Sequence, residues 1–471
     1  MSHSIRKYLW AFPALTLLYF FGLDHVGLLG PDEPRYASIG REMARSGDWV
    51  TPRLDGQAWF EKPVLLYWMT GAAYKMGLDD DLAPRVPVAL LAVAFLIFFF
   101  WIVKKEFCHD SALNAVVILA TTAGWLAYGQ IGVTDMPLAA TFSAAVLLCL
   151  KPGVRRAALA GAFLGLAVLA KGLVPLVLAV PLLWKRKFSD LAALSVACVA
   201  VAGPWYVICT MRNGAPFLQE LILKQHFSRM TSAAEIGHGQ PIWYYIPVLL
   251  AAVFPWTPFL FAISPQEAKK DSRQLLLLMC IALGFVFFSI APNKLPGYLL
   301  PLLPAIAVLM GIRMAEMKSA RYYLMATAVL MALIPVVGEM LPRALLVGLR
   351  GVKPTVSLYW LPLFIAVAFG MKLLEDSGKR RFAITILGTL LIASTVFFKS
   401  WVYPRLESTY SARYVWHRID GRPDAVCIED IGRNWIYGLN FYAGHSFPPC
   451  ATGKFGIRLI PGEAKRPVII F

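Results

Sequence analysis

Residues 86–103 read VPVALLAVAFLIFFFWIV, and two lysines, Lys104 and Lys105, follow directly. An uncharged run of about 17–25 apolar residues is long enough to cross the hydrocarbon core of a bilayer as a helix. Basic residues next to such a run are typical of the cytoplasmic side of a membrane. This stretch therefore predicts a membrane-spanning helix whose carboxyl end faces the cytoplasm.

The composition extends this pattern to the whole chain. Of the 471 residues, 58% are hydrophobic and 15% are charged, whereas soluble domains carry about 25% charged residues. The apolar residues come in blocks of membrane-spanning length. A soluble enzyme, a disordered chain and a disulfide-rich secreted module are excluded, and an α-helical polytopic membrane protein is predicted.

About thirteen apolar segments of this kind follow one another over residues 1–402, which we expect to form one transmembrane domain. No small-x-small cleavage site follows the first segment, so we expect an uncleaved helix there. The segments run near 8–29, 86–103, 113–130, 136–150, 157–170, 172–184, 190–210, 242–262, 274–291, 296–312, 322–340, 357–371 and 382–402.

The orientation follows from basic residues in the short connections. Seven basic clusters fall on alternate connections, which puts the amino terminus in the cytoplasm and the carboxyl terminus outside. This placement also explains the net charge of +17 and argues against a nucleic-acid partner. The clusters are Arg6–Lys7, Lys104–Lys105, Lys151/Arg155/Arg156, Lys185/Arg186/Lys187, Lys269/Lys270/Arg273, Arg313/Lys318/Arg321 and Lys372/Lys379/Arg380/Arg381.

Three hydrophilic regions are predicted outside: loops near 30–85 and 211–241, and the tail 403–471. The tail mixes short β-prone runs with turn residues, which indicates a small α/β domain near the lower size limit for independent folding. Cys427 and Cys450 both lie in it. Because the outside compartment is oxidising, we hypothesise a disulfide between them.

Ionisable side chains gather on the predicted outside face. Each costs roughly 2.5–3.5 kcal/mol at membrane depth and is therefore a functional candidate. Two carboxylates can orient or deprotonate an acceptor, and nearby cations can hold a phosphate leaving group. The candidates are Asp32, Glu33 and Arg35 after the first segment, Glu61 and Lys62 in the first loop, Asp135 after the third segment, and Lys294 and Tyr298 between the ninth and tenth.

Each candidate also has a purely structural alternative. Asp32 or Glu33 could cap a helix that runs through Ala44. Asp135 could start a helix, and Lys294 could extend to lipid headgroups. These alternatives do not explain why two acidic positions and two lysines converge on one face.

Seven motifs within residues 30–304 resemble those of the aminoarabinose (4-amino-4-deoxy-L-arabinose) lipid A transferase family. That family is one of the polytopic C-type glycosyltransferases, beside the protein O-mannosyltransferases. After about residue 320 the similarity is limited to hydropathy and an outside tail. The motifs are Asp32-Glu-Pro-Arg-Tyr-Ala, Gly47-Asp-Trp-Val-Thr-Pro-Arg, Trp59-Phe-Glu-Lys-Pro, Thr134-Asp-Met-Pro, Ala170-Lys-Gly, Pro241-Ile-Trp-Tyr-Tyr and Lys294-Leu-Pro-Gly-Tyr.

The resemblance implies transfer of a sugar from a polyprenyl-phosphate donor to an acceptor, typically lipid A, at the periplasmic face of a bacterial inner membrane. Asp32 would be the essential carboxylate of the first loop, and Asp135 the second acidic residue. Lys62 would contact the donor phosphate. Glu61, with His238 as a possible partner, would hold a divalent metal ion. The short tail departs from the family and would accompany a different acceptor.

Two other functions stay open at this point. One is a protein O-mannosyltransferase-like enzyme, and the other is a secondary transporter or lipid flippase. Transporters place ionisable groups near the bilayer midplane on broken helices, and Gly172 and Pro175 leave room for such a break. The ionisable candidates here gather outside instead, which favours the transferase.

Overall fold

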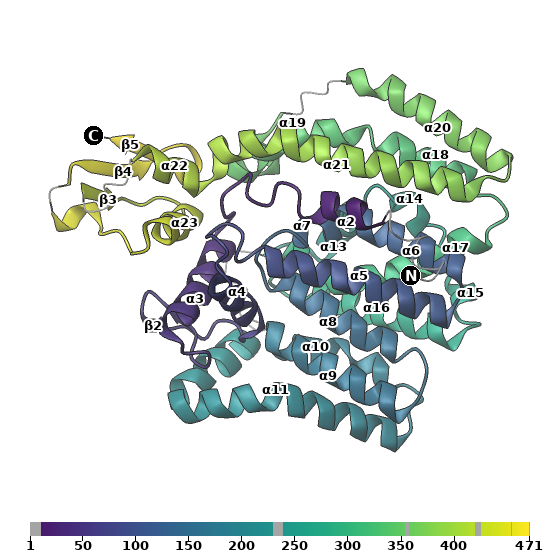
Figure 1. Cartoon of the computed structure of the whole chain (residues 1–471), viewed down its shortest axis with the longest axis horizontal. Coiled ribbons are helices and arrows are strands. Elements are labelled where there is room, and N and C mark those ends of the chain that lie inside the picture. Colours follow the sequence, from purple (N-terminus) through teal and green to yellow (C-terminus); the bar gives the residue numbers. More distant parts are fainter. Residues whose placement is uncertain (1–10, 229–238, 354–357, 420–424, 454, 471) are drawn as a thin grey trace.

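Apolar helices that run side by side build most of the molecule (Figure 1). The computed structural model describes residues 11–228, 239–353, 358–419, 425–453 and 455–470. Within these residues, six helical stretches are long and apolar enough to cross a membrane, judged by length and composition. They are Val86–Glu106, Phe188–Leu221, Ser272–Ile290, Pro296–Glu316, Arg321–Val347 and Arg380–Tyr410.

These six stretches consist of one or two elements each. They contain α5 (Val86–Glu106), α11 (Phe188–Phe217) with the start of η2 (Leu218–Ser228), α16 (Ser272–Ile290), η4 (Pro296–Leu302) with α17 (Leu303–Glu316), α18 (Arg321–Leu330) with α19 (Leu333–Val347), and α21 (Arg380–Tyr410).

Shorter helices occupy the other predicted segments. A spanning helix needs at least about 17 residues, and of these shorter helices only α9, with 18 residues, reaches that length. The polytopic helical class is therefore confirmed, whereas the number of thirteen crossings stays a prediction. The shorter helices are α2 (Ala11–Tyr19), α6 (His109–Thr121), α7 (Ala123–Tyr128), α8 (Asp135–Leu148), α9 (Val154–Lys171), α10 (Val174–Leu178), η1 (Val180–Leu183), η3 (Ile242–Tyr244), α13 (Tyr245–Ala252), α14 (Thr257–Leu260), α15 (Pro265–Ala268), η5 (Leu349–Gly351), η6 (Leu358–Trp360) and α20 (Leu361–Asp376).

One predicted segment is broken rather than continuous. Gly172 ends α9 with a φ of 73°, a conformation that glycine adopts without strain. Pro175 then lies in the first turn of α10, where its missing N–H has no partner to lose. The segment near 172–184 is thus a five-residue α-helix followed by a 3-10 turn.

Two other segments extend further than predicted. α11 reaches Phe217 instead of residue 210, with a kink at Gly214 (φ 61°), and α21 reaches Tyr410 instead of residue 402. The apolar run marks where a helix leaves lipid, but its backbone hydrogen bonds can continue into water. The second predicted outside loop therefore begins with helix.

The predicted outside loop near 30–85 is folded. It contains α3 (Asp32–Ser46), the hairpin of β1 (Arg53–Leu54) and β2 (Gln57–Ala58), and α4 (Leu65–Lys75). α3 packs closely on α4 because Gly40 has no side chain: a Cβ there would lie 2.6 Å from Cγ2 of Thr70. The helix that carries Asp32 is thus held on a second helix.

Residues 412–470 form a small unit of helices and strands at one end of the molecule, which is yellow in Figure 1. The strand order is β3-β4-β5, with β4 parallel to β3 and antiparallel to β5. The hypothesised disulfide between Cys427 and Cys450 is present. We call this the C-terminal unit; its elements are α22 (Ala412–Arg418), β3 (Val426–Ile428), α23 (Arg433–Ala443), η8 (Cys450–Thr452), β4 (Ile457–Pro461), η9 (Glu463–Lys465) and β5 (Pro467–Ile470).

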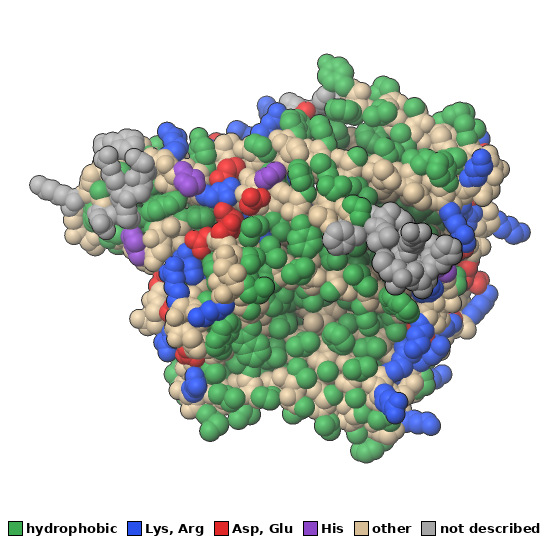
Figure 2. Space-filling view, viewed as in Figure 1, with side chains coloured by type: hydrophobic (Ala, Val, Ile, Leu, Met, Phe, Trp, Pro, Cys, Tyr) green, Lys and Arg blue, Asp and Glu red, His purple; other side chains and the backbone are tan. Residues whose placement is uncertain are grey.

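Loops that were predicted to share the cytoplasmic side meet at the end of the bundle away from the C-terminal unit. Arg156 lies 2.7 Å from the Glu106 carboxylate, and Arg273 donates a hydrogen bond to the Glu106 carbonyl. Arg381 pairs with Asp110 at 2.8 Å. Basic side chains are visible along this end in Figure 2. The contacts agree with the predicted grouping of the loops.

A variant of Lys399 can test how α2 is held against α21. This buried lysine of α21 donates hydrogen bonds to the carbonyls of Leu18 (3.0 Å) and Phe21 (2.7 Å) at the end of α2. Because Lys399→Met leaves these carbonyls without that donor, we expect a loss of about 1–3 kcal/mol of stability. Thermal unfolding in detergent measures it, with the exposed neighbour Ser400→Ala as control. Equal unfolding temperatures for both variants would contradict this role.

Candidate active site

Glu33, in the first turn of α3, lies in the interior. Its side chain is 1% exposed and forms a two-pronged ion pair with Arg85, with Nε–Oε1 and Nη2–Oε2 both at 2.8 Å. The Gly132 amide donates to Oε1 at 2.8 Å, and the Leu29 amide donates to Oε2 at 2.7 Å. Four hydrogen bonds therefore occupy the carboxylate.

Arg85 extends this network into the chain before α3. It donates hydrogen bonds to the carbonyls of Leu23 (2.6 Å), Val26 (2.5 Å) and Gly27 (3.0 Å). Burial by itself lowers the pKa of the Arg85 guanidinium, but the Glu33 carboxylate outweighs it and the pKa is raised overall. We call the pair the Glu33–Arg85 clamp. Its geometry favours a positioning role for Glu33 over the predicted catalytic one.

Asp32 precedes Glu33 but lies at the surface, with its side chain 43% exposed. It accepts a hydrogen bond from Arg35 one turn later in α3. The helix begins after Pro31, and no side chain caps it, so the capping alternative is wrong for both acidic residues. Asp32 is therefore placed to meet a ligand that approaches from outside.

Arg35 connects Asp32 with the first loop. Its Nη1 lies 3.1 Å from Oε2 of Glu61, and Nζ of Lys62 lies 3.6 Å from Oε1 of the same carboxylate. Burial lowers the pKa of Arg35, but Glu61, Tyr36 and Asp32 raise it above its ordinary value. The result is a row of alternating charges, Asp32, Arg35, Glu61 and Lys62, which we call the first-loop charge row.

Asp135 is the first residue of α8 and pairs with a lysine that the sequence analysis did not select. Lys171, the last residue of α9, places Nζ 2.6 Å from Oδ1 of Asp135 and 4.8 Å from the ring centroid of Tyr298. A Cβ at Gly297 would lie 2.6 Å from the same Oδ1, so the backbone there approaches Asp135 closely. The signal for Lys171 was its isolated position within the Ala170-Lys-Gly motif.

An electrostatic interaction links the two groups. Asp32 lies close enough to Lys171 for an electrostatic interaction between the two charges. Each of the two carboxylates, Asp32 and Asp135, has a cation next to it. That both serve one site, as the sequence predicted, stays a prediction.

Lys294 lies just before η4 and Tyr298 lies within it, but their side chains make different contacts. Tyr298 reaches Lys171, whereas buried Lys294 donates a hydrogen bond from Nζ to the carbonyl of Ala291 at 2.6 Å. Tyr245 holds this loop by donating to the Leu295 carbonyl at 3.0 Å. The burial of Lys294 does not fit the alternative in which it extends to lipid headgroups.

The predicted metal ligands are only partly described. Glu61 contacts Arg35 and Lys62, and His238 lies outside the described residues. Among the residues that the structure describes, no three His, Cys, Asp or Glu side chains are grouped to hold a metal ion. Since a zinc site usually has three or four ligands, the metal stays a prediction.

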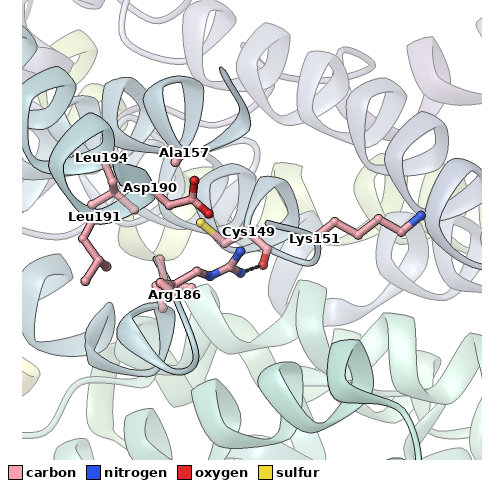
Figure 3. Close-up of a pocket in the computed structure, with 8 residues that line it drawn as sticks. Cys149, Lys151, Ala157, Arg186, Asp190, Leu191 and Leu194 are labelled. Atoms are coloured by element: carbon pink, nitrogen blue, oxygen red, sulfur yellow. Dashed lines mark hydrogen bonds between the residues drawn. The ribbon is translucent and has the colours of Figure 1, made fainter. Parts of the chain in front are cut away.

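A hollow at the predicted cytoplasmic end is unrelated to this site (Figure 3). In it, Arg186 donates a hydrogen bond to the Cys149 carbonyl, and Asp190 accepts one from the Gly153 amide at 3.0 Å. Its polar groups thus hold the chain between α8 and α11. The lining residues are Cys149, Lys151, Ala157, Leu182, Arg186, Asp190, Leu191 and Leu194.

The clamp gives a prediction that separates the two roles of Glu33. Glu33→Gln removes one charge of a buried pair and leaves Arg85 uncompensated, so we expect a loss of about 3–5 kcal/mol of stability. Thermal unfolding measures this loss, with Asp32→Asn as the control that leaves stability nearly unchanged. A Glu33→Gln protein of parental stability would contradict the clamp as the main role of Glu33.

In comparisons with known proteins, this chain is similar to glycosyltransferases named for lipid-phosphate sugar donors. Residues 4–222 match the model of the dolichyl-phosphate-mannose-protein mannosyltransferase family. An undecaprenyl phosphate-α-4-amino-4-deoxy-L-arabinose arabinosyl transferase of Pseudomonas fluorescens Pf0-1 is 29% identical over 66% of this chain and 60% of its own length. A second one, from P. fluorescens Pf-5, is 32% identical over 64% of this chain and 56% of its own length.

The fold also matches a solved structure. The crystal structure of ArnT from Cupriavidus metallidurans bound to undecaprenyl phosphate has a TM-score of 0.74 and 23% identity, covering 95% of this chain and 86% of the other. The resemblance predicted from the motifs is thus confirmed, and the fold is that of a helical polytopic glycosyltransferase. The matched region spans 56% to 60% of these two curated relatives.

Proposed function

We propose that this chain is a membrane glycosyltransferase that moves a sugar from a polyprenyl-phosphate donor to lipid A or a similar acceptor. The observation that carries the proposal is that each of the two candidate aspartates forms an ion pair with a cation. Asp32 pairs with Arg35, and Asp135 pairs with Lys171. Both curated relatives are named for the donor undecaprenyl phosphate-aminoarabinose, which supports this donor class.

In the proposed reaction, the bond between the sugar's anomeric carbon and the donor phosphate breaks. The bonding electrons leave with the polyprenyl phosphate, and an acceptor oxygen forms the new bond to the anomeric carbon. Lys62 and Arg35 bind the phosphate and stabilise the charge that develops there. Asp32 and Asp135 orient the acceptor. A hydroxyl acceptor would pass its proton to one of them, whereas an ionised phosphate acceptor has none to lose.

The proposed topology follows the basic clusters. The amino terminus faces the cytoplasm of a bacterium, about thirteen crossings span the inner membrane, and the site and the predicted tail domain 403–471, which includes the C-terminal unit, face the periplasm. The disulfide supports this side, because structural disulfides persist in oxidising compartments. A lipid-linked donor would reach such a site laterally.

We propose a supporting role for any metal. If Glu61 and His238 hold a divalent ion, it would order the loop that carries Lys62, since glycosyl transfer from a lipid phosphate requires no metal-bound nucleophile. The contacts of Glu61 with Arg35 and Lys62 order that loop in the same way.

A flippase is the second candidate, because one observation favours it. The Lys171–Asp135 pair lies where α9 breaks before α10, and broken helices with ionisable groups are typical of transporters. Purified protein in detergent distinguishes the two functions: a transferase forms sugar-linked acceptor without a membrane, and a flippase does not. The same assay with a peptide acceptor tests the protein O-mannosyltransferase alternative.

The paired acidic residues give the main test. We expect Asp32→Asn and Asp135→Asn each to abolish most transfer with little change in unfolding temperature, because asparagine keeps the size of the side chain. The double variant should be hardly slower than the slower single one, as for residues that act as a unit. Initial rates with purified protein check this, with exposed Asp430→Asn as control. Parental rates for well-folded Asp32→Asn would remove it from the site.

Lys62 gives a test of donor binding. Because it lies at the end of the first-loop charge row, Lys62→Ala should weaken polyprenyl-phosphate binding by about tenfold or more, the loss of one charge-assisted contact. Lys62→Arg should keep part of the affinity, since charge remains but geometry differs. Titration calorimetry measures both, with exposed Lys75→Ala on α4 as the matched control. Unchanged affinity in Lys62→Ala would exclude this contact.

A further inference from the structure

Three aromatic rings surround the guanidinium of Arg35. Its central carbon lies 5.5 Å from the ring centroid of Tyr36, 5.7 Å from that of Trp59 and 5.3 Å from that of Tyr437. The first two belong to the outside loop near 30–85. Tyr437 belongs to α23 of the C-terminal unit, four hundred residues further along the chain.

Polar contacts fix α23 against α3, beside which it lies in Figure 1. Arg41 of α3 donates a hydrogen bond to the Phe441 carbonyl at 2.7 Å and lies 4.3 Å from the Phe441 ring centroid. Tyr442 donates to Asp81 at 2.7 Å and accepts from the Leu28 amide at 2.8 Å. The position of Tyr437 is therefore set by the same helix that carries Arg35.

A second set of contacts joins the start of the C-terminal unit to the outside loops. Arg413 forms ion pairs with Asp81 (2.5 Å) and Glu407 (2.9 Å) and donates to the Asp24 carbonyl at 2.9 Å. Acidic and basic side chains gather in Figure 2 where the C-terminal unit meets the rest of the molecule. The unit is thus docked on the site end by charges as well as by apolar contacts.

The three aromatic rings fix the orientation of the Arg35 guanidinium. Asp32 and Glu61 both attract the guanidinium, so charge alone does not fix its orientation. Ring faces attract a cation without neutralising it, and three of them restrict the guanidinium to one place between the carboxylates. With Arg35 only 5% exposed, these rings also keep water away from it.

We infer that Tyr437 is a positioning residue that holds Arg35, so that the C-terminal unit forms one wall of the active site. The inference rests on the proposed function, in which Arg35 binds the donor phosphate and stabilises the charge that develops there. The C-terminal unit therefore takes part in catalysis, because substitutions of Tyr437 in α23 alter the rate of sugar transfer by displacing Arg35.

The test compares three variants on α23. Tyr437→Phe keeps the ring, Tyr437→Leu keeps apolar bulk without a ring, and Ile436→Ala loosens the core of the unit without touching Arg35. We expect near-parental transfer for Tyr437→Phe. For Tyr437→Leu we expect kcat to fall about tenfold or more with little change in the KM of the acceptor, as for a misplaced catalytic group. Ile436→Ala should lower the unfolding temperature and leave kcat unchanged.

A double variant shows whether Tyr437 acts through Arg35. In an Arg35→Met background, Tyr437→Leu should produce no further loss of kcat, because the group it positions is gone. An additive further loss would overturn the inference, as would parental kcat in Tyr437→Leu. Equal losses of kcat in Tyr437→Leu and Ile436→Ala would also overturn it, since they would indicate a purely structural role.

Amide exchange tests the contact between Tyr437 and Arg35 without relying on the proposed function. Mass-spectrometric hydrogen exchange should be faster in residues 32–36 of Tyr437→Leu than in the parental protein, and unchanged there in Ile436→Ala. If the parental protein transfers no sugar, the proposed function fails, while the exchange result still decides the contact between Tyr437 and Arg35. Unchanged exchange in Tyr437→Leu would overturn the inference.

Discussion

The Glu33–Arg85 clamp is the interaction on which the site end depends. Glu33 in the first turn of α3 and Arg85 just before α5 bond each other, and they also bond the chain before α3 and the loop before α8. A buried ion pair tolerates its desolvation only when further hydrogen bonds satisfy both groups, and here they do. The clamp thereby fixes the ends of three helices relative to one another, including α8, which carries Asp135.

Helix geometry explains why neighbouring carboxylates have different roles. Successive residues of an α-helix point about 100° apart, so Glu33 enters the interior while Asp32 stays at the surface. The buried carboxylate holds the scaffold, and the exposed one meets ligands. The two arginines differ in the same way: Arg35 pairs with the exposed Asp32, whereas Arg85 pairs with the buried Glu33.

The sequence predicted the helical class and the cysteine pair, because hydropathy and compartment determine them. Gly172 and Pro175 indicated room for a break, but hydropathy alone gave one segment near 172–184, since it measures transfer into lipid and not the continuity of backbone hydrogen bonds. The clamp was missed because a motif gives order along the chain but not the direction of a side chain. Tyr437 lies in a tail without a recognisable motif, so only the fold brings it to Arg35.

The charge pattern of the site also constrains how a donor would bind. Arg35 and Lys62 share Glu61, and Lys171 holds Asp135, so these three cations already have carboxylate partners. Under the proposed function, an incoming phosphate must compete with Glu61 for Arg35 and Lys62. A phosphate bound there would accept hydrogen bonds from Arg35 and Lys62, whose charges Glu61 now shares. Its negative charge would also lie near Asp32, which is paired with the same Arg35.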